Sequence, residues 1–354
     1  MNKTFQYETN SVYYLIFISL FLTGNVSSQG LPSRIAFGSC GSQDKPMPIL
    51  DTCLKYRPDL FVWLGDNIYG DTKDMQVLRN KYAKLGAKPE FQRLKNATRF
   101  LATWDDHDYG WNDSGRHYPY KKESKEIFLD FWEEPANSLR RQHEGIYTSY
   151  MYEQDGKRLQ VILLDNRSFR DDLRVYRGEL NREDRYFYAL DYYPHNTKDS
   201  TLLGETQWQW LESELRKPAD LRIIGSGTQF SIAFNGYEAW ANFPHERQRM
   251  LDLIKKTRAN GVLFITGDVH YAEISVLKEE GMYPVYDVTA SGITSTWHFA
   301  TPNDNRIEGP VMDNHFGLLN IDWKQKDPVI KMEVYDIRGN QRIEHSIRLS
   351  EISF

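Results

Sequence analysis

The sequence lacks the features that several protein classes require. Its 354 residues include two cysteines, which excludes a scaffold held together by many disulfides. The 44 Lys and Arg residues form no basic run and are outnumbered by 49 Asp and Glu, so we do not expect a nucleic-acid-binding surface. With 40% hydrophobic and 26% charged residues, the composition is that of an ordinary globular protein, and disorder of the whole chain is excluded.

The N-terminal segment has the features of an export signal. Residues 15–21 (LIFISLF) form a short apolar core, and small residues at 26–28 follow it. We therefore expect residues 1–28 to be a signal peptide and residues 29–354 to be a single domain, secreted or periplasmic. The alternative is an uncleaved anchor, because Glu8 stands before the apolar core. No later stretch reaches the roughly 18 apolar residues of a membrane span, so the mature chain should not cross a membrane.

Apolar runs rich in β-branched residues alternate with stretches of helical periodicity, which predicts an α/β domain with several parallel strands. The expected strands are residues 34–40, 59–69, 100–108, 161–167, 222–230 and 262–270. The expected helices are residues 73–96 (in pieces), 121–132, 205–217 and 244–258. Four further segments, with no helix among them, predict an antiparallel sheet that closes the domain: 285–288, 317–323, 329–335 and 342–349. The irregular stretch 168–201 is either a functional loop or a surface insertion.

Five of the six expected strands end in polar, mostly acidic clusters. The clusters are FGSCGSQ (37–43), LGDNIYGD (64–71), TWDDHDYGWND (103–113), LLDNR (163–167) and ITGDVHYAE (265–273). Because ligands of open α/β sheets bind beyond the carboxyl ends of the strands, we expect these clusters to converge. So many carboxylates in one crevice would repel one another unless a multivalent cation neutralised them. The sequence therefore predicts a metal site.

The residue types in these clusters predict a site for more than one kind of cation. Asp and Asn side chains supply the hard oxygens that Ca²⁺, Mg²⁺ and Mn²⁺ prefer, whereas His270 and a Cys40 thiolate suit a softer transition metal. Tyr69, three residues after Asp66, offers a phenolate suited to a ferric ion. In an exported protein Cys40 and Cys53 could instead form a disulfide, but the place of Cys40 at a strand end favours a ligand. The candidate metal ligands are Cys40, Asp66, Tyr69, Asp106, Asn112, Asp268 and His270.

Taken in order, the motifs resemble those of the alkaline phosphatase D (PhoD-like) family of calcineurin-like metallophosphoesterases. The likeness rests on the strand-end clusters together with LGETQWQWLESEL (203–215) and GYEAWANFPHER (236–247). The resemblance implies an α/β fold built as a four-layer αββα sandwich of two mixed sheets. It also implies a site that holds Fe³⁺ and Ca²⁺, with Mn, Mg or Zn as alternatives. The usual Asp-x-His after the first strand is replaced here by residues 38–40 (Gly-Ser-Cys), which fits this subfamily.

The family pattern also implies roles for single residues. The iron would be bound by Cys40, Asp66, Tyr69 and Asp268, of which the two aspartates would also lie near calcium. Asn112 would serve calcium, and His270 would lie in the same cluster. Asp106 and His107 resemble the Asn-His pair of other metallophosphoesterases, in which one residue is a metal ligand and the other contacts phosphate.

Such a polynuclear site predicts hydrolysis of phosphate esters. Cations acidify bound water and clamp phosphoryl oxygens, so a metal-bound hydroxide would attack phosphorus in line, with Asp66 fixing the separation of the metals. His107 is the candidate general acid or phosphate donor; the alternative is a core histidine bonded to a carboxylate. Arg167 is a candidate phosphate clamp, or else a partner for Asp165 or for the acidic residues Asp171 and Asp172. His298 and His315, near the expected mouth of the site, are candidates for substrate contact.

We therefore expect an exported, metal-dependent phosphodiesterase of the alkaline phosphatase D type, whose partner is a phosphate ester. A phosphomonoesterase or a phospholipase-like enzyme is the alternative within the same class. A secreted calcium-dependent glycan-binding protein is a remote alternative, since 22 Tyr and 9 Trp residues could form aromatic platforms. Two features argue against it: the candidate ligands are spread over residues 40–270 instead of one loop, and Cys40 with His270 does not suit an oxygen-only calcium site.

Overall fold

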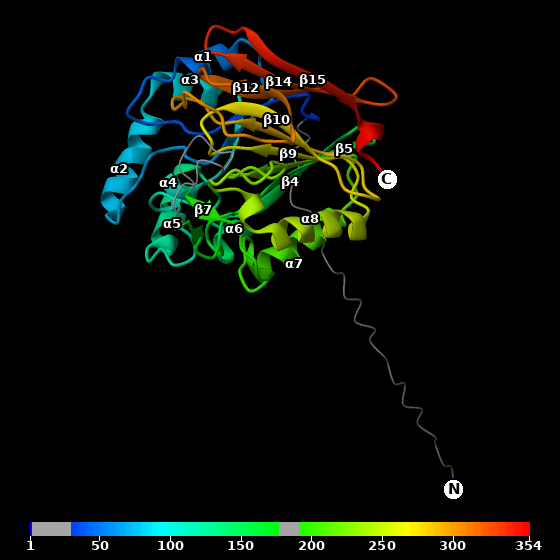
Figure 1. Cartoon of the computed structure of the whole chain (residues 1–354), viewed down its shortest axis with the longest axis horizontal. Helices are drawn as coiled ribbons and strands as arrows, with labels where there is room; N and C mark the ends of the chain where they lie inside the picture. The colour runs from blue at the N-terminus through cyan, green and yellow to red at the C-terminus, as the bar shows by residue number, and fades with distance from the viewer. Residues whose placement is uncertain (2–29, 177–190) are drawn as a thin grey trace, which may run out of the picture.

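The computed structural model of the chain describes Met1 and residues 30–176 and 191–354. Apart from Met1, the expected signal peptide lies outside the described residues, as does part of the irregular stretch 168–201. In the described part, two large mixed β-sheets pack face to face and helices cover their outer faces (Figure 1). The four-layer αββα sandwich expected from the sequence is therefore confirmed.

The first sheet has the strand order β15-β14-β13-β1-β2-β3. Its strands are β1 (Arg34–Gly38), β2 (Leu60–Leu64), β3 (Arg99–Thr103), β13 (His315–Asp322), β14 (Val329–Asp336) and β15 (Gln341–Arg348). Strands β1, β2 and β3 are parallel. Strand β13 pairs antiparallel with β1, β14 with β13, and β15 with β14. The carboxyl ends of β1, β2 and β3 therefore meet at one rim of the sheet.

The second sheet has the order β12-β10-β11-β9-β8-β5-β4. Its strands are β4 (Thr148–Gln154), β5 (Lys157–Leu163), β8 (Leu221–Ser226), β9 (Val262–Thr266), β10 (Ala272–Leu277), β11 (Val285–Ala290) and β12 (Arg306–Val311). The four central strands β5, β8, β9 and β11 are parallel, and the flanking strands are antiparallel.

The helices divide between the two outer layers. Those near the first sheet are α1 (Pro48–Leu54), α2 (Met75–Gly86), α3 (Pro89–Ala97) and α5 (Lys121–Phe131), and those on the second are α7 (Gly204–Leu215) and α8 (Pro244–Thr257). Short elements complete the chain: α4 (Asp106–Tyr109), α6 (Leu139–Gln142), β6 (Arg174–Val175), β7 (Tyr192–Tyr193), and the single-turn segments Trp240–Asn242 and Leu349–Ile352. None of the described helices is long and apolar enough to cross a bilayer.

Strand periodicity explains how the layers hold together. Side chains along a strand alternate between the two faces of the sheet. In β1, Ile35 and Phe37 belong to the large core that includes the second sheet, whereas Ala36 belongs to the core under the helices of the first sheet. In β2, Val62 faces the second sheet and Trp63 faces the helices. Because both faces are buried, these strands are apolar throughout, as parallel strands between two layers require.

The sequence-based elements differ from the structure mainly near the C-terminus. The four segments expected to form one antiparallel sheet are divided: β13, β14 and β15 extend the first sheet, but β11 pairs parallel with β9 in the second. Strand β4 was not expected, because it is an edge strand whose sequence TSYMYEQ is mostly polar and partly exposed. The broken helix expected over 73–96 is confirmed as α2 and α3, with Pro89 at the start of the second helix.

Candidate metal centre

The predicted convergence of the strand ends is confirmed. Cys40 follows β1, Asp66 follows β2 and Asp106 follows β3, all at one rim of the first sheet. The rim of the second sheet meets them, since Cys40 Sγ lies 3.6 Å from the carbonyl oxygen of Asp268, which follows β9. The backbone nitrogen of Ser39 also donates to the carbonyl of Ala290 at the end of β11 (3.2 Å). One site is thus built from both sheets.

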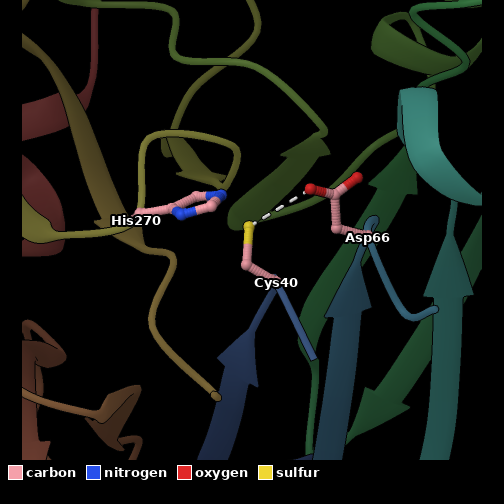
Figure 2. A group of neighbouring side chains, drawn as sticks. All are labelled: Cys40, Asp66 and His270. Carbon is pink, nitrogen blue, oxygen red and sulfur yellow. Dashed lines mark hydrogen bonds between the residues drawn. The ribbon is translucent and has the colours of Figure 1, made fainter. Parts of the chain in front are cut away.

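The first group of ligand atoms comes from Cys40, Asp66 and His270 (Figure 2). One ligand atom from each of these residues lies within 4.8 Å of the others, and Cys40 Sγ is 3.4 Å from Asp66 Oδ2. Tyr69 stands beside the group, with its hydroxyl oxygen 3.3 Å from His270 Nε2. Cys40 and Cys53 are both buried free thiols, so the alternative of a disulfide between them is not realised.

Two further groups continue from the first. Asp66, Asp106 and His107 form the second, and Asp106, Asp113 and Glu238 form the third, again with ligand atoms within 4.8 Å of one another. Because Asp66 and Asp106 each belong to two groups, the three groups form a continuous row. Asp113 also accepts a hydrogen bond from the hydroxyl of Tyr192, which ties the described end of the irregular stretch to this row.

Two expected ligands lie beside the row. Asn112 is exposed, and its amide nitrogen donates to Asp113 Oδ2 at 2.7 Å, so it borders the third group. The Asp268 carboxylate belongs to none of the three groups, but burial and the nearby carboxylates of Asp105 and Asp106 raise its pKa well above the usual range. Both residues therefore remain predicted ligands.

The backbone at the ligands is unusual. Cys40, Asp66, Asp268 and His270 have φ values of 60°, 48°, 77° and 58°, in the left-handed region that residues other than glycine rarely adopt. Backbone strain of this kind persists where the surrounding structure enforces it, and it is frequent at functional sites. Each of these residues ends or follows a strand, so the left-handed turn directs the chain away from the sheet at the point where the ligand is presented.

The chemistry of the donor set fits bound cations. Asp66 Oδ1 and Asp105 Oδ2 are buried and have no hydrogen-bond partner among the described residues. Burial raises the pKa of the Cys40 thiol to about 12, and burial together with Cys40 and Asp106 raises the pKa of Asp66. Burial likewise raises the pKa of the Tyr69 phenol. A cation at the row would pair with the orphaned oxygens and favour the ionised forms of these groups.

His107 is oriented by a carboxylate that the sequence analysis did not single out. Its Nδ1 lies 2.7 Å from Asp71 Oδ1, and its ring lies 4.4 Å from the ring of Tyr69. Burial lowers the pKa of His107, but the hydrogen bond to Asp71 and the charge of Asp106 outweigh it and raise the pKa to about 9. His107 is thus bonded to a carboxylate, as the alternative interpretation expected, and its role as a general acid or phosphate donor stays a prediction.

The expectation that Arg167 clamps phosphate is wrong. The side chain is fully buried, with Nε 2.7 Å from Asp105 Oδ1 and Nη1 2.7 Å from Glu238 Oε2. Arg170 Nε lies 3.0 Å from the other carboxylate oxygen of Glu238, Oε1. Buried carboxylates are costly unless they are paired, and these arginines supply the internal counter-charge. Arg167 therefore does not reach a substrate. Its guanidinium pairs with Asp105 and Glu238, and not with the expected Asp165, Asp171 or Asp172.

The expected substrate contact at His315 is also wrong. His315 is fully buried; its Nε2 accepts from the backbone nitrogen of Ser291 at 2.9 Å, and its Nδ1 lies 2.7 Å from the carbonyl of Asp313. The histidine therefore supports Ser291, whose hydroxyl lies 3.2 Å from Cys40 Sγ. His298 is exposed and stays a predicted substrate contact.

Sequence reasoning missed Asp71, Asp113 and Glu238. Asp71 and Asp113 stand at the ends of two clusters that were identified, and Glu238 stands in the motif GYEAW. They were missed because the residues chosen as ligands lie closer to the ends of the strands. Glu238 comes from a loop that follows β8, and it meets Arg167, which follows β5, because β5 and β8 are parallel neighbours in the second sheet.

Solved structures share this architecture. PhoD matches with a TM-score of 0.63 and 19% identity over 90% of this chain and 73% of its own. GAP50, the anchor in the inner membrane complex of Plasmodium, matches with a TM-score of 0.56 and 14% identity over 90% of this chain and 89% of its own. A dimetal phosphatase from Danio rerio has a TM-score of 0.51 and 15% identity, covering 92% of this chain and 100% of its own. The class is thus the calcineurin-like two-sheet fold.

Within that class, the sequence identifies the family. The family model for the PhoD-like phosphatase matches residues 72–306, more than half of the chain, so the protein belongs to the PhoD-like phosphatase family. Alkaline phosphatase D of Bacillus subtilis (strain 168) is 24% identical over 314 residues, which cover 74% of this chain and 52% of that protein. The chain thus spans about half the length of this curated relative.

The buried state of His315 makes stability depend on pH. Burial lowers its pKa from 6.5 to about 4, so the unfolded chain binds the proton more readily than the folded protein. The neutral His315 therefore contributes roughly 3 kcal/mol to the free energy of unfolding. This contribution is present in full above about pH 6.5 and is lost as the pH falls toward about 4. Urea unfolding of wild type and His315→Gln at several pH values should show the stability difference narrowing with acidification. A difference that stays constant would contradict the assignment.

Proposed function

We propose that the protein is a metal-dependent phosphoester hydrolase of the alkaline phosphatase D type that acts on phosphodiesters. The observation that carries the proposal is the continuous row of three ligand groups joined by Asp66 and Asp106. Shared carboxylates hold neighbouring cations at a fixed spacing, which is the arrangement that stabilises both the attacking and the leaving oxygen of an in-line displacement. Membership of the PhoD-like phosphatase family supports the same reaction.

Bound cations would supply an activated water and charge stabilisation on the phosphoryl oxygens. The chain's own residues would position the ligand groups, compensate buried charge and donate the proton. Asp66 and Asp106 keep the ligand groups in register, and Arg167 neutralises Asp105 and Glu238 so that these buried carboxylates do not oppose an incoming phosphate. His107, held through Nδ1 by Asp71, would donate a proton from its Nε2 to the leaving oxygen.

We propose Fe³⁺ and Ca²⁺ as the cations. The first group and Tyr69 combine a thiol, an imidazole and a phenol, a donor set that suits a transition metal. The third group contains only carboxylates and borders the amide of Asn112, a donor set that suits calcium. In this assignment Cys40, Tyr69 and the aspartates hold the iron.

We also propose that the protein is exported. This rests on the sequence of residues 1–28, in which a short apolar core precedes small residues. Free thiols at Cys40 and Cys53 are compatible with export when Cys40 is held as a metal ligand.

Asp66→Ala should abolish hydrolysis. The substitution removes a ligand from two groups, so bis(p-nitrophenyl) phosphate turnover should fall by roughly 1,000-fold or more together with the loss of metal, because cationic charge stabilisation is worth several kcal/mol. Turnover, metal content and circular dichroism are the measurements. Asp51→Ala is the matched control, since it removes a partly exposed carboxylate that is paired with Arg93 and should change little. Activity retained in Asp66→Ala would overturn the proposed function.

Tyr69→Phe should change the colour of the protein. A ferric ion bound by a phenolate gives a charge-transfer band in the visible region, which neither Ca²⁺ nor Zn²⁺ produces. Tyr69 lies 3.3 Å from His270, so both can reach one ion. The wild-type protein should therefore contain iron and show the band, and Tyr69→Phe should lose it with little change in calcium content. An iron-containing wild type without the band would refute the ferric–phenolate assignment.

Asp71→Asn should impair chemistry more than binding. The amide keeps the size of the side chain and tolerates the positive φ of 43°, but it no longer offers a carboxylate to His107. Loss of such an orienting partner typically costs about 10- to 100-fold in activity. Steady-state kinetics should show kcat falling while KM and metal content stay close to wild type. A change confined to KM would assign His107 to substrate binding alone.

A further inference from the structure

An uncharged segment borders the first ligand group. Residues 291–303 (SGITSTWHFATPN) contain no Asp, Glu, Lys or Arg, although the neighbouring row of ligand groups is strongly acidic. The segment begins at the Ser291 hydroxyl, which lies 3.2 Å from Cys40 Sγ. Its composition therefore changes from polar to aromatic within a few residues of the metal ligands.

Hydrogen bonds fix this segment against the ligands. The backbone nitrogen of Thr294 donates to the carbonyl of Cys40, and that of Trp297 donates to the carbonyl of His270, both at 3.1 Å. The backbone nitrogen of His270 in turn donates to the Ser291 hydroxyl at 2.9 Å. The position of Trp297 relative to Cys40 and His270 is thus set by the same contacts that place the ligands.

Three aromatic rings form a continuous surface there, which we call the aromatic shelf: Tyr237, Trp297 and Phe299. The Trp297 ring centroid lies 5.3 Å from the His270 ring, and the Phe299 ring stacks on Trp297 at 5.2 Å with planes 13° apart. Tyr237 lies 5.2 Å from Trp297 and directly precedes Glu238 of the third group. Trp297 is partly exposed, and Phe299 is 41% exposed.

We propose that the aromatic shelf binds a planar aromatic group on the substrate phosphorus. The inference rests on the proposed function, because a phosphoryl group at the row of ligands would place its organic substituent beside His270. Exposed aromatic surface next to a polar site is typical of ligand recognition, and stacking favours planar groups over saturated ones. The three rings of the shelf carry no charge themselves, so we expect the substituent that stacks on them to be neutral.

The test compares three phosphonates that differ only in the organic group. Phenylphosphonate, cyclohexylphosphonate and methylphosphonate present the same anion with a planar, a saturated and a minimal substituent. Calorimetric titration of the full metal-containing protein, at a pH where all three are dianions, gives each Kd without relying on turnover. We expect phenylphosphonate to bind about 3- to 10-fold more tightly than either of the others.

Paired variants assign the preference to Trp297. Trp297→Phe keeps a planar ring and should retain the preference for phenylphosphonate, whereas Trp297→Leu, which is apolar but not planar, should remove it while leaving the Kd of methylphosphonate within about 2-fold. Asp51→Ala is again the control, because its carboxylate pairs with Arg93 and belongs to none of the three ligand groups. That variant should bind all three phosphonates as the wild type does.

The outcomes separate this inference from the proposed function. Equal binding of phenyl- and cyclohexylphosphonate, a preference that survives Trp297→Leu, or no binding of any phosphonate overturns the role of the shelf. Hydrolysis of bis(p-nitrophenyl) phosphate is measured on the same preparation. Hydrolysis without a phenyl preference refutes the shelf alone, whereas a phenyl preference without hydrolysis of any ester supports the shelf and refutes the proposed hydrolase.

Discussion

The main constraint on the structure is the repulsion among carboxylates that are buried together where the rims of the two sheets meet. Asp66, Asp105, Asp106 and Glu238 are each at most 5% exposed, and like charges in such a place cannot all be ionised without compensation. Arg167 and Arg170 compensate part of the charge from inside the protein. In the described part of the chain Asp66 Oδ1 and Asp105 Oδ2 have no hydrogen-bond partner, and a bound cation would neutralise the negative charge that remains there.

The two-sheet architecture is what brings these charges together. Parallel strands β1, β2 and β3 end at one rim and present Cys40, Asp66 and Asp106, while β9 and the segment after β11 bring His270 and Ser291 from the other sheet. The apolar core between the sheets stabilises the docking, and polar contacts at its edge set the distances. His315 in turn supports Ser291, because its Nε2 accepts a hydrogen bond from the backbone nitrogen of Ser291.

The sequence predicts those parts that follow from strand polarity. Ligands directly after β1, β2 and β3 can be found because the carboxyl ends of parallel strands meet and acidic clusters there are conspicuous. The partners of Arg167 could not be found, because Glu238 is 71 residues away and belongs to a loop with no regular pattern. His315 could not be separated from a surface histidine, since its burial depends on the start of β13 packing against residues 291 and 292 after β11. The edge strand β4 escaped notice because its polar residues give little hydrophobic signal.

The contact between Cys40 and Ser291 joins residues that are 251 positions apart, and it sits inside the first ligand group. This separation sets the order in which the protein is assembled. A chain that is still being synthesised has Cys40 and Asp66 early but lacks His270 and Ser291 until most of the second sheet exists. A cation at this group could therefore be held by its complete set of ligands only after both sheets have docked, which makes the site a property of the finished fold and not of any single segment.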